Sequence, residues 1–485
     1  MTLKNKVLWL IAISSLLRIV IAATTALGND EVYYWTYALQ PDWNHFDHPP
    51  LVGLMIRLFT LNLHFREELF VRLGALFSSA FCTLILYRML SRLHSETAGW
   101  YAALLYTSSF YCSIIAGLLI LPDSPQLFFW LISVYLMMEV FIIQPEKHNK
   151  MLLLGLSIGL ATMCKVHGVF LWVAAGAYIL FFNREWLARW QLYLSILIFF
   201  LITSPILLWN IQNHFITYTF HEARVSSTGG TFKPLDLLRE LLGEILYNSP
   251  LNYLLYLIAL TALFRGQFQI HSKLKYLLLL LAFPLLATIW IISSFNPTLP
   301  HWTGPAFIAL IILTSIYLAQ RQPGPQIPLL VKVSLTLTVV TIISAWIYIN
   351  CFPGTMGSKS KENLGEGDPA LDMYGWDQLR DQFKYIRTAD LRSHLMQASS
   401  PVLSEKWFPA AHLEFYIAEP LNTDLLAAGS INNIHKFAWL NYKRKLLQTG
   451  ENCYYITPST LAFSPEQLYG AYFKSISKPI EIPIK

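Results

Sequence analysis

Charged residues are scarce in this sequence. Asp, Glu, Lys and Arg make up 13% of its 485 residues, whereas a soluble domain carries about 25%. So little charge cannot cover the surface of a soluble protein of this length. The hydrophobic residues, 55% of the chain, are gathered in blocks of about 20, the length that a helix needs to cross a bilayer. The sequence therefore predicts a polytopic α-helical membrane protein.

Cysteine is also scarce, and its five positions define no metal or redox motif. The chain has no Cys-x-x-Cys pair and no Cys/His spacing typical of zinc, so no metal site is predicted. Three cysteines lie in apolar blocks, where a thiol behaves as a small hydrophobic group. Cys351 and Cys453 fall in the polar C-terminal part, and a disulfide between them stays open.

The chain has no excess of acidic residues, and its net charge is +6. In a membrane protein, an excess of Lys and Arg reports topology and contact with anionic lipid rather than nucleic-acid binding. The short outer connections around Leu121 and Pro297 contain neither Lys nor Arg. We therefore expect a cytoplasmic N-terminus, with basic inner connections at Lys4, Lys6, Arg88, Arg92, Lys147, Lys150, Arg184, Arg189, Arg265, Lys273, Lys275 and Arg321.

Hydropathy predicts about eleven spans, and this odd number places the C-terminus outside the cytoplasm. The first apolar stretch is interpreted as a retained helix, because it contains Arg18 and is long for a signal peptide. The chain has no internal repeat, so the inverted-repeat architecture of many transporters has no support. The expected spans are 7–27, 69–90, 97–117, 126–144, 151–164, 168–183, 191–209, 246–264, 274–293, 302–319 and 328–350.

The chain changes character after about residue 350. Gly, Pro and charged residues become common, and short apolar runs such as 401–403 and 453–456 alternate with helix-like stretches such as 408–417. We expect a transmembrane domain over 1–350 and a small extracytoplasmic α/β domain over 351–485.

Two adjacent carboxylates, Asp30 and Glu31, follow the first span. Neighbouring residues on a helix point about 100° apart, so different roles are expected for the two. A carboxylate beside low-dielectric surroundings makes a plausible general base, because partial desolvation raises its proton affinity. The pair would also cap the following helix and interact favourably with its dipole. The residues alone leave both interpretations open.

Asp123 and Lys165 are two further candidates. Asp123 lies in an outer connection, where it could converge on a cavity with Asp30 or begin the fourth span, since Asp-Ser-Pro is a good helix start. Lys165 separates two short apolar blocks, and a lysine at this depth either serves function or snorkels to the interface. A lipid-linked phosphate would be its natural partner.

Basic and aromatic residues recur in the later outer connections. In the polar segment 210–244, Arg224 and Lys233 could add charge to a phosphate site or belong to a solvated loop. The Ser-Ser-Thr-Gly-Gly stretch at 226–230 would suit a loop that closes over a lipid headgroup. His301 precedes Trp302, a residue type common at membrane interfaces, and could contact a phosphate or an acceptor.

The order of these motifs resembles bacterial glycosyltransferase family 39, the superfamily of dolichyl-phosphate-mannose-protein mannosyltransferases and aminoarabinose transferases. This resemblance implies the GT-C fold. Its motifs are Asp-Glu at 30–31 followed by Tyr-Tyr-Trp at 33–35, Phe-Asp-His-Pro-Pro-Leu at 46–51, Leu-Pro-Asp-Ser-Pro at 121–125, Cys-Lys-Val-His-Gly at 164–168, Pro-x-x-x-Trp-Asn at 205–210, His-Trp at 301–302 and Tyr-Gly-Trp at 374–376.

The resemblance implies an inverting glycosyltransferase of the inner membrane that moves a monosaccharide from polyprenyl (undecaprenyl) phosphate to a periplasmic acceptor. Lipid A, lipopolysaccharide or another envelope glycan is the expected acceptor, and a protein hydroxyl is the alternative. No cofactor is certain, although a bridging divalent cation stays open. The implied catalytic residues are Asp30, Asp123 and Glu31, and the implied substrate-binding residues are Lys165, Arg224, His301, Asp47, His48, Tyr34 and Lys233.

Two other classes of protein remain as alternatives. A lipid transporter would need paired charges deep in several spans, of which the sequence offers few. A non-enzymatic envelope assembly protein would leave the outer carboxylates dispensable. The enzyme interpretation depends on one arrangement, in which Asp30 and Asp123 meet Lys165 in a shared pocket.

Overall fold

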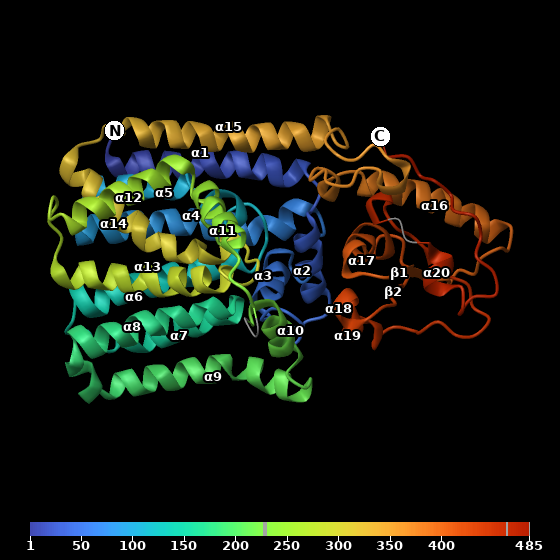
Figure 1. Ribbon diagram of the computed structural model, residues 1–485, viewed down its shortest axis with the longest axis horizontal. Coiled ribbons are helices and arrows are strands. Elements are labelled where there is room, and N and C mark those ends of the chain that lie inside the picture. The colour runs from blue at the N-terminus through green and yellow to red at the C-terminus, as the bar shows by residue number, and fades with distance from the viewer. Residues whose placement is uncertain (227–229, 462–463, 485) are drawn as a thin grey trace. The chain divides into compact units, whose positions relative to one another are not determined.

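The computed structural model describes residues 1–226, 230–461 and 464–484 and is mostly helical (Figure 1). Its chain forms two compact units, the first made of 1–22 and 41–342 and the second of 23–40 and 343–485. The second unit therefore includes a stretch from near the N-terminus that lies within the 1–350 domain expected from the sequence. That division of the chain at residue 350 stays a prediction.

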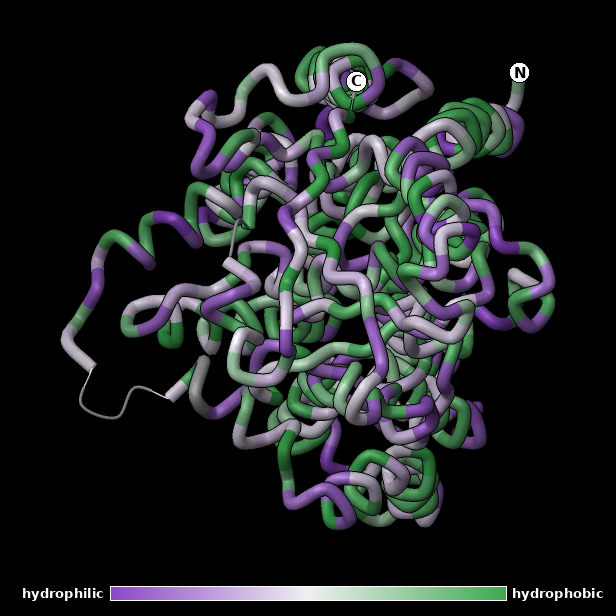
Figure 2. Tube along the Cα trace, turned by 90° about the vertical axis from the view of Figure 1, so that its right-hand side faces the viewer, coloured by the Kyte–Doolittle hydropathy of each residue, from purple (hydrophilic) through white to green (hydrophobic). Residues whose placement is uncertain are grey.

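Long apolar helices confirm a polytopic membrane protein. Among the described residues, seven helices are long and apolar enough to span a bilayer, and hydrophobic residues run along helices seen end-on in Figure 2. The seven are α1 (Leu3–Thr24), α4 (Glu68–Leu93), Asp123–Ile143 (α6, Asp123–Met138, with its π-helical end), α9 (Trp190–Gln212), α13 (Ser272–Ser293), Pro300–Arg321 (the 3-10 helix η5, Pro300–Ala306, with α14, Phe307–Arg321) and α15 (Leu329–Cys351).

Shorter helices occupy the other expected spans, so the count of eleven is not confirmed. Three are apolar: α7 (Lys150–Cys164), Val166–Phe182 with α8 (Val169–Phe182), and α12 (Pro250–Phe264). The expected span 97–117 is divided into α5 (Glu96–Thr107) and a separate π-helical turn, Tyr111–Ile115.

Small residues allow the helices of the first unit to pack closely. α7 packs against both α6 and α9, as Figure 1 shows. A Cβ atom at Gly155 would lie 2.2 Å from the carbonyl oxygen of Ser195, so only glycine permits this approach of α7 to α9. The opposite side of α9 exposes large apolar residues such as Phe200 and Leu201, as expected of a helix that faces lipid.

The outer connections of the first unit are folded into short helices: α3 (Leu51–Phe59), α10 (Ile216–Val225) and α11 (Pro234–Tyr247). The sequence-based interpretation of 210–244 as a polar outer segment missed the pattern in α11. Its leucines at 235, 238, 242 and 246 are exposed, whereas Glu240 and Glu244 are buried. The two glutamates are four residues apart and so share the inner face of the helix. The expected closing loop at 226–230 lies largely outside the described residues.

The second unit contains a small parallel sheet. Its strand order is β2 (Leu425–Ala427), β1 (Val402–Ser404), β3 (Tyr454–Tyr455), with Val402 opposite both Leu425 and Tyr454. β1 and β3 coincide with two of the short apolar runs of the sequence. The helices of this unit are α2 (Asn29–Leu39), α16 (Trp376–Arg392), α17 (Trp407–Leu413) with the π-helical turn Glu414–Ala418, α18 (Ile431–Ile434), α19 (Phe437–Asn441) and α20 (Pro465–Tyr469).

Candidate active site

A buried ion pair lies at the centre of the candidate site in the first unit. The Lys165 Nζ atom is 3.0 Å from each carboxylate oxygen of Asp123. The two residues are only 4% and 2% exposed, so Lys165 does not snorkel. Asp123 begins α6, and Lys165 has an extended backbone conformation that ends α7. The break that the sequence places between two apolar blocks thus turns the lysine towards the carboxylate.

Tyr111 completes the polar contacts of this carboxylate. Its hydroxyl donates to Asp123 Oδ1 at 3.2 Å. An ammonium group has three N–H donors, and two of those of Lys165 are directed at Asp123. Within the described ranges these are the bonds of the Lys165 ammonium, so its third N–H could bind an incoming anion.

Histidines surround the ion pair. His301, His167 and His48 all lie within electrostatic range of Lys165. The rings of His48 and His221 stack at 6.0 Å, and His221 Nε2–H donates to the Asp47 carbonyl oxygen at 2.7 Å. Desolvation lowers the pKa of His48 despite the neighbouring Asp47. A neutral His48 can donate a hydrogen bond without adding charge to the site.

The structure therefore brings together five of the expected residues and adds three more. Asp47, His48, Asp123, Lys165 and His301 lie in one region of the first unit. Sequence reasoning did not propose Tyr111, His167 or His221 as site residues. Only the Cys-Lys-Val-His-Gly motif gave a signal, because it places His167 two residues after Lys165.

A glycine allows Tyr111 to approach η5, the segment that carries His301. A Cβ atom at Gly304 would lie 2.2 Å from the Tyr111 ring. Because Gly304 has no side chain, η5 can lie against the ring of Tyr111.

Two buried carboxyl groups connect α11 to α13 and to the segment between α13 and η5. Glu244 Oε1 accepts from Trp290 Nε1 at 2.9 Å, and Glu240 Oε2 accepts from Thr298 Oγ1 at 2.6 Å. Burial raises the pKa of Glu244 to about 8 and also raises that of Glu240. Glu244 is therefore mainly neutral at pH 7, and it holds α11 in place as a hydrogen-bonded acid.

Asp30 and Glu31 have different environments in the second unit. Glu31 is 1% exposed, and its Oε2 accepts from the Gly28 amide at 3.0 Å, which caps the start of α2. Asp30, one position earlier, is exposed. This difference favours a capping role for Glu31. Tyr34, a predicted substrate-binding residue, is buried among the rings of Tyr33 and Tyr37.

The remaining predicted residues contribute less to the candidate site. Lys233 is exposed just before α11, where its amide donates to the Ser294 carbonyl oxygen at 2.7 Å. The side chain of Arg224 lies outside the described residues. Cys351 and Cys453 are both free thiols. Over the described ranges, no group of three or more His, Cys, Asp or Glu side chains could hold a metal ion.

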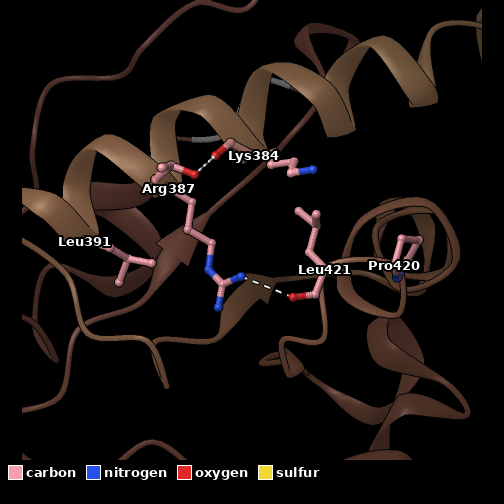
Figure 3. Close-up of a pocket in the computed structure, with 6 residues that line it drawn as sticks. Lys384, Arg387, Leu391, Pro420 and Leu421 are labelled. Atoms are coloured by element: carbon pink, nitrogen blue, oxygen red, sulfur yellow. Dashed lines mark hydrogen bonds between the residues drawn. The ribbon is translucent and has the colours of Figure 1, made fainter.

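A pocket of about 300 Å³ lies in the second unit, beside α16 (Figure 3). Arg387 points into it from α16, but its guanidinium donates to the carbonyl oxygens of Leu421 and Ala398 at 3.2 and 2.9 Å. The Arg387 guanidinium thus connects two segments of the unit. Its lining residues are Lys384, Arg387, Thr388, Leu391, Pro420 and Leu421.

The fold is that of a multi-pass membrane protein of the GT-C type. This chain is similar to the solved structure of ArnT from Cupriavidus metallidurans bound to undecaprenyl phosphate. The two have a TM-score of 0.54 and 16% sequence identity, and the match covers 73% of this chain and 66% of that one. The apo structure of ArnT from the same organism gives a TM-score of 0.51 at 15% identity, with the same coverage.

Two sequence matches cover parts of the chain. Residues 47–209, which include Asp47, His48, Asp123 and Lys165, match the model of the dolichyl-phosphate-mannose-protein mannosyltransferase family. A lipid A galacturonosyltransferase, RgtD, from Rhizobium johnstonii is 23% identical over 299 residues, or 61% of each chain. This chain thus spans less than two thirds of the length of these relatives. The matches confirm the resemblance to glycosyltransferase family 39.

Proposed function

We propose that this protein is a glycosyltransferase that uses a polyprenyl-phosphate-linked sugar as its donor. The observation that carries the proposal is the buried Asp123–Lys165 pair, in which Lys165 keeps one N–H for a phosphate oxygen. Tyr111 orients the carboxylate, and His301 lies near the pair. The GT-C fold, shared with an ArnT structure bound to undecaprenyl phosphate, supports this donor class.

In the proposed reaction, a hydroxyl or phosphate oxygen of the acceptor attacks the anomeric carbon opposite the donor phosphate. Asp30 takes the proton of an attacking hydroxyl as the new C–O bond forms. The bond between the anomeric carbon and the phosphate oxygen breaks, the anomeric centre is inverted, and polyprenyl phosphate leaves. Lys165 stabilises the leaving phosphate, and such preorganised electrostatic stabilisation is usually the largest catalytic contribution.

Lipid A or another envelope glycan is the proposed acceptor, because the matched relative RgtD is a lipid A galacturonosyltransferase. A protein hydroxyl is the second candidate, because the matching family model is that of protein mannosyltransferases. The site would face the periplasm, with the N-terminus in the cytoplasm and the second unit outside. The inner membrane is the proposed location.

The test combines a search for the product with a matched pair of variants. Mass spectrometry of envelope lipids from cells with and without the protein identifies the missing sugar and its acceptor. Membranes are then supplied with undecaprenyl-phosphate-linked galacturonic acid and aminoarabinose, each tested in turn with lipid A. Asp30→Asn should lower transfer by about 100-fold or more, the contribution of a general base. The control Asp381→Asn changes another exposed carboxylate and should keep full activity.

Each outcome of this test decides between the candidates. A sugar missing from envelope protein rather than from lipid would favour the protein acceptor. Normal transfer by Asp30→Asn would remove this residue from the mechanism. If no lipid, glycan or protein of the envelope loses a sugar when the protein is absent, the transferase proposal is wrong, and a transporter or assembly role takes its place.

A further inference from the structure

Asp30 lies in a stretch of chain that the second unit holds in place. Residues 23–40 are part of that unit, although more than 300 residues separate them from the rest of it. α2 packs against α17. The ring of Tyr33 lies 5.1 Å from that of Trp407, and the ring of Trp35 lies 5.0 Å from that of Phe415.

Two side chains hold the start of α2 from one side. His412 Nε2–H donates to Asn29 Oδ1 at 2.9 Å, and the Leu27 amide donates to the Tyr416 hydroxyl at 2.7 Å. His412 and Tyr416 are four residues apart and so lie on the same face of a continuous helical segment. Together they fix the chain on both sides of Gly28, whose amide is bound by Glu31.

The two side chains are themselves immobilised. The His412 ring stacks on Trp376 at 4.1 Å, with 11° between the planes, and on Tyr416 at 6.0 Å, with 13° between the planes. All three residues are buried. Burial holds the pKa of His412 well below its usual value, so the imidazole stays neutral. Asn29 also hydrogen-bonds to the Asp372 side chain, so the amide group is held on both sides.

We infer that His412 and Tyr416 are positioning residues, through which the second unit fixes the catalytic Asp30 for proton abstraction. This inference rests on the proposed function, because it takes Asp30 as the general base. Asn29 and Glu31, the residues on either side of Asp30, both fix the chain through their side chains, and Asp30 itself is exposed.

The test uses two substitutions that each remove one hydrogen bond, and two control substitutions. His412→Leu removes the bond to Asn29, and Tyr416→Phe removes the acceptor for the Leu27 amide. His412→Gln keeps an N–H donor at a similar distance along the side chain and should recover much of the lost rate. Tyr442→Phe changes a tyrosine of the same unit that is 84% exposed, and it should behave as the wild type.

We expect kcat to fall by about 100-fold in His412→Leu, because a misplacement of about 1 Å has an effect of this size. The KM for the undecaprenyl-phosphate sugar that the wild type accepts should not change. In an Asp30→Asn background the same substitution should lower kcat less than 2-fold, because groups that act as one unit are not additive. A purely structural role would instead lower kcat by similar factors in both backgrounds, and that result would overturn the inference.

Amide hydrogen exchange separates failure of this inference from failure of the proposed function. His412→Leu and Tyr416→Phe should accelerate exchange in residues 27–40, whereas Tyr442→Phe should not. If the wild type has no transferase activity, the proposed function fails and with it the catalytic reason for positioning. If the wild type is active but His412→Leu has normal kcat and normal exchange, only the inference is wrong.

Discussion

Replacement of Lys165 by methionine tests whether the buried ion pair is kept for stability or for function. Sequence alone treats Lys165 as a single cation, whereas the structure pairs it with Asp123. In Lys165→Met, the Asp123 carboxylate stays 2% exposed and loses both contacts to the ammonium group. The hydroxyl of Tyr111 would be its one remaining partner among these contacts.

The structure sets the size of the effect. Removal of one partner from a buried ion pair destabilises a protein by about 3–5 kcal/mol, because the other charge stays buried and uncompensated. A loss of about 3 kcal/mol lowers the folded-to-unfolded ratio roughly 150-fold at 1.4 kcal/mol for each factor of ten. The double variant Lys165→Met/Asp123→Asn has no charge left to compensate, so it should recover most of the lost stability. Transfer should be lost in both variants.

Thermal unfolding in detergent, followed by tryptophan fluorescence, measures the stability of the two variants, and the mass-spectrometric transfer assay measures their activity. The reasoning is refuted if Lys165→Met melts at the wild-type temperature, because the pair would then carry little interaction energy. It is also refuted if the double variant transfers sugar normally. A stable but inactive double variant would show that the ion pair is kept for the reaction.

Three further substitutions test other parts of the structure. Glu244 has a folded-state pKa of about 8, against a usual 4.5, so the native state holds the proton over this pH range. The stability of the wild type should therefore fall between pH 4.5 and pH 8, by up to about 5 kcal/mol. In Glu244→Gln the melting temperature should depend less on pH. Burial raises the pKa of Glu414 to about 7, and Arg444→Leu removes its ion-pair partner at 2.6 Å. Above pH 7, urea unfolding should show that the second unit loses about 3 kcal/mol of stability. Gly304→Ala places a Cβ atom 2.2 Å from the Tyr111 ring and should lower the melting temperature, at a cost of about 1–3 kcal/mol, and reduce transfer.

Local sequence patterns predicted much of the first unit. The apolar blocks located its helices, and the break around Lys165 was visible because a polar residue separates two blocks that are each too short for an ordinary span. The count of eleven spans is not confirmed, and the expected span 97–117 is divided where α5 ends at Thr107 and a separate π-helical turn follows. Hydropathy averages over such a break, since the residues on both sides of it are apolar.

Tertiary contacts between distant parts of the chain could not be predicted from the sequence. The bond from His412 to Asn29 joins residues 383 positions apart, and no local pattern reports it. The assignment of 23–40 to the second unit follows from such contacts. The roles of Asp30 and Glu31 were left open for a related reason, because both interpretations use the same residue types. Only the burial of Glu31 beside the Gly28 amide distinguishes them.

The chemistry of the ion pair explains why a membrane protein would keep it. An unpaired ammonium at this depth would carry a desolvation penalty of several kcal/mol, whereas a pair of well-packed apolar residues would often be as stable as the ion pair or more so. Pairing with Asp123 lowers the cost of the lysine without using its third N–H donor. The neutral His48 adds hydrogen-bonding capacity without adding charge, since desolvation lowers its pKa. Under the proposed function, such a site would be prepared for the donor phosphate before it arrives, and Asp123 would again compensate the charge of Lys165 once the phosphate leaves.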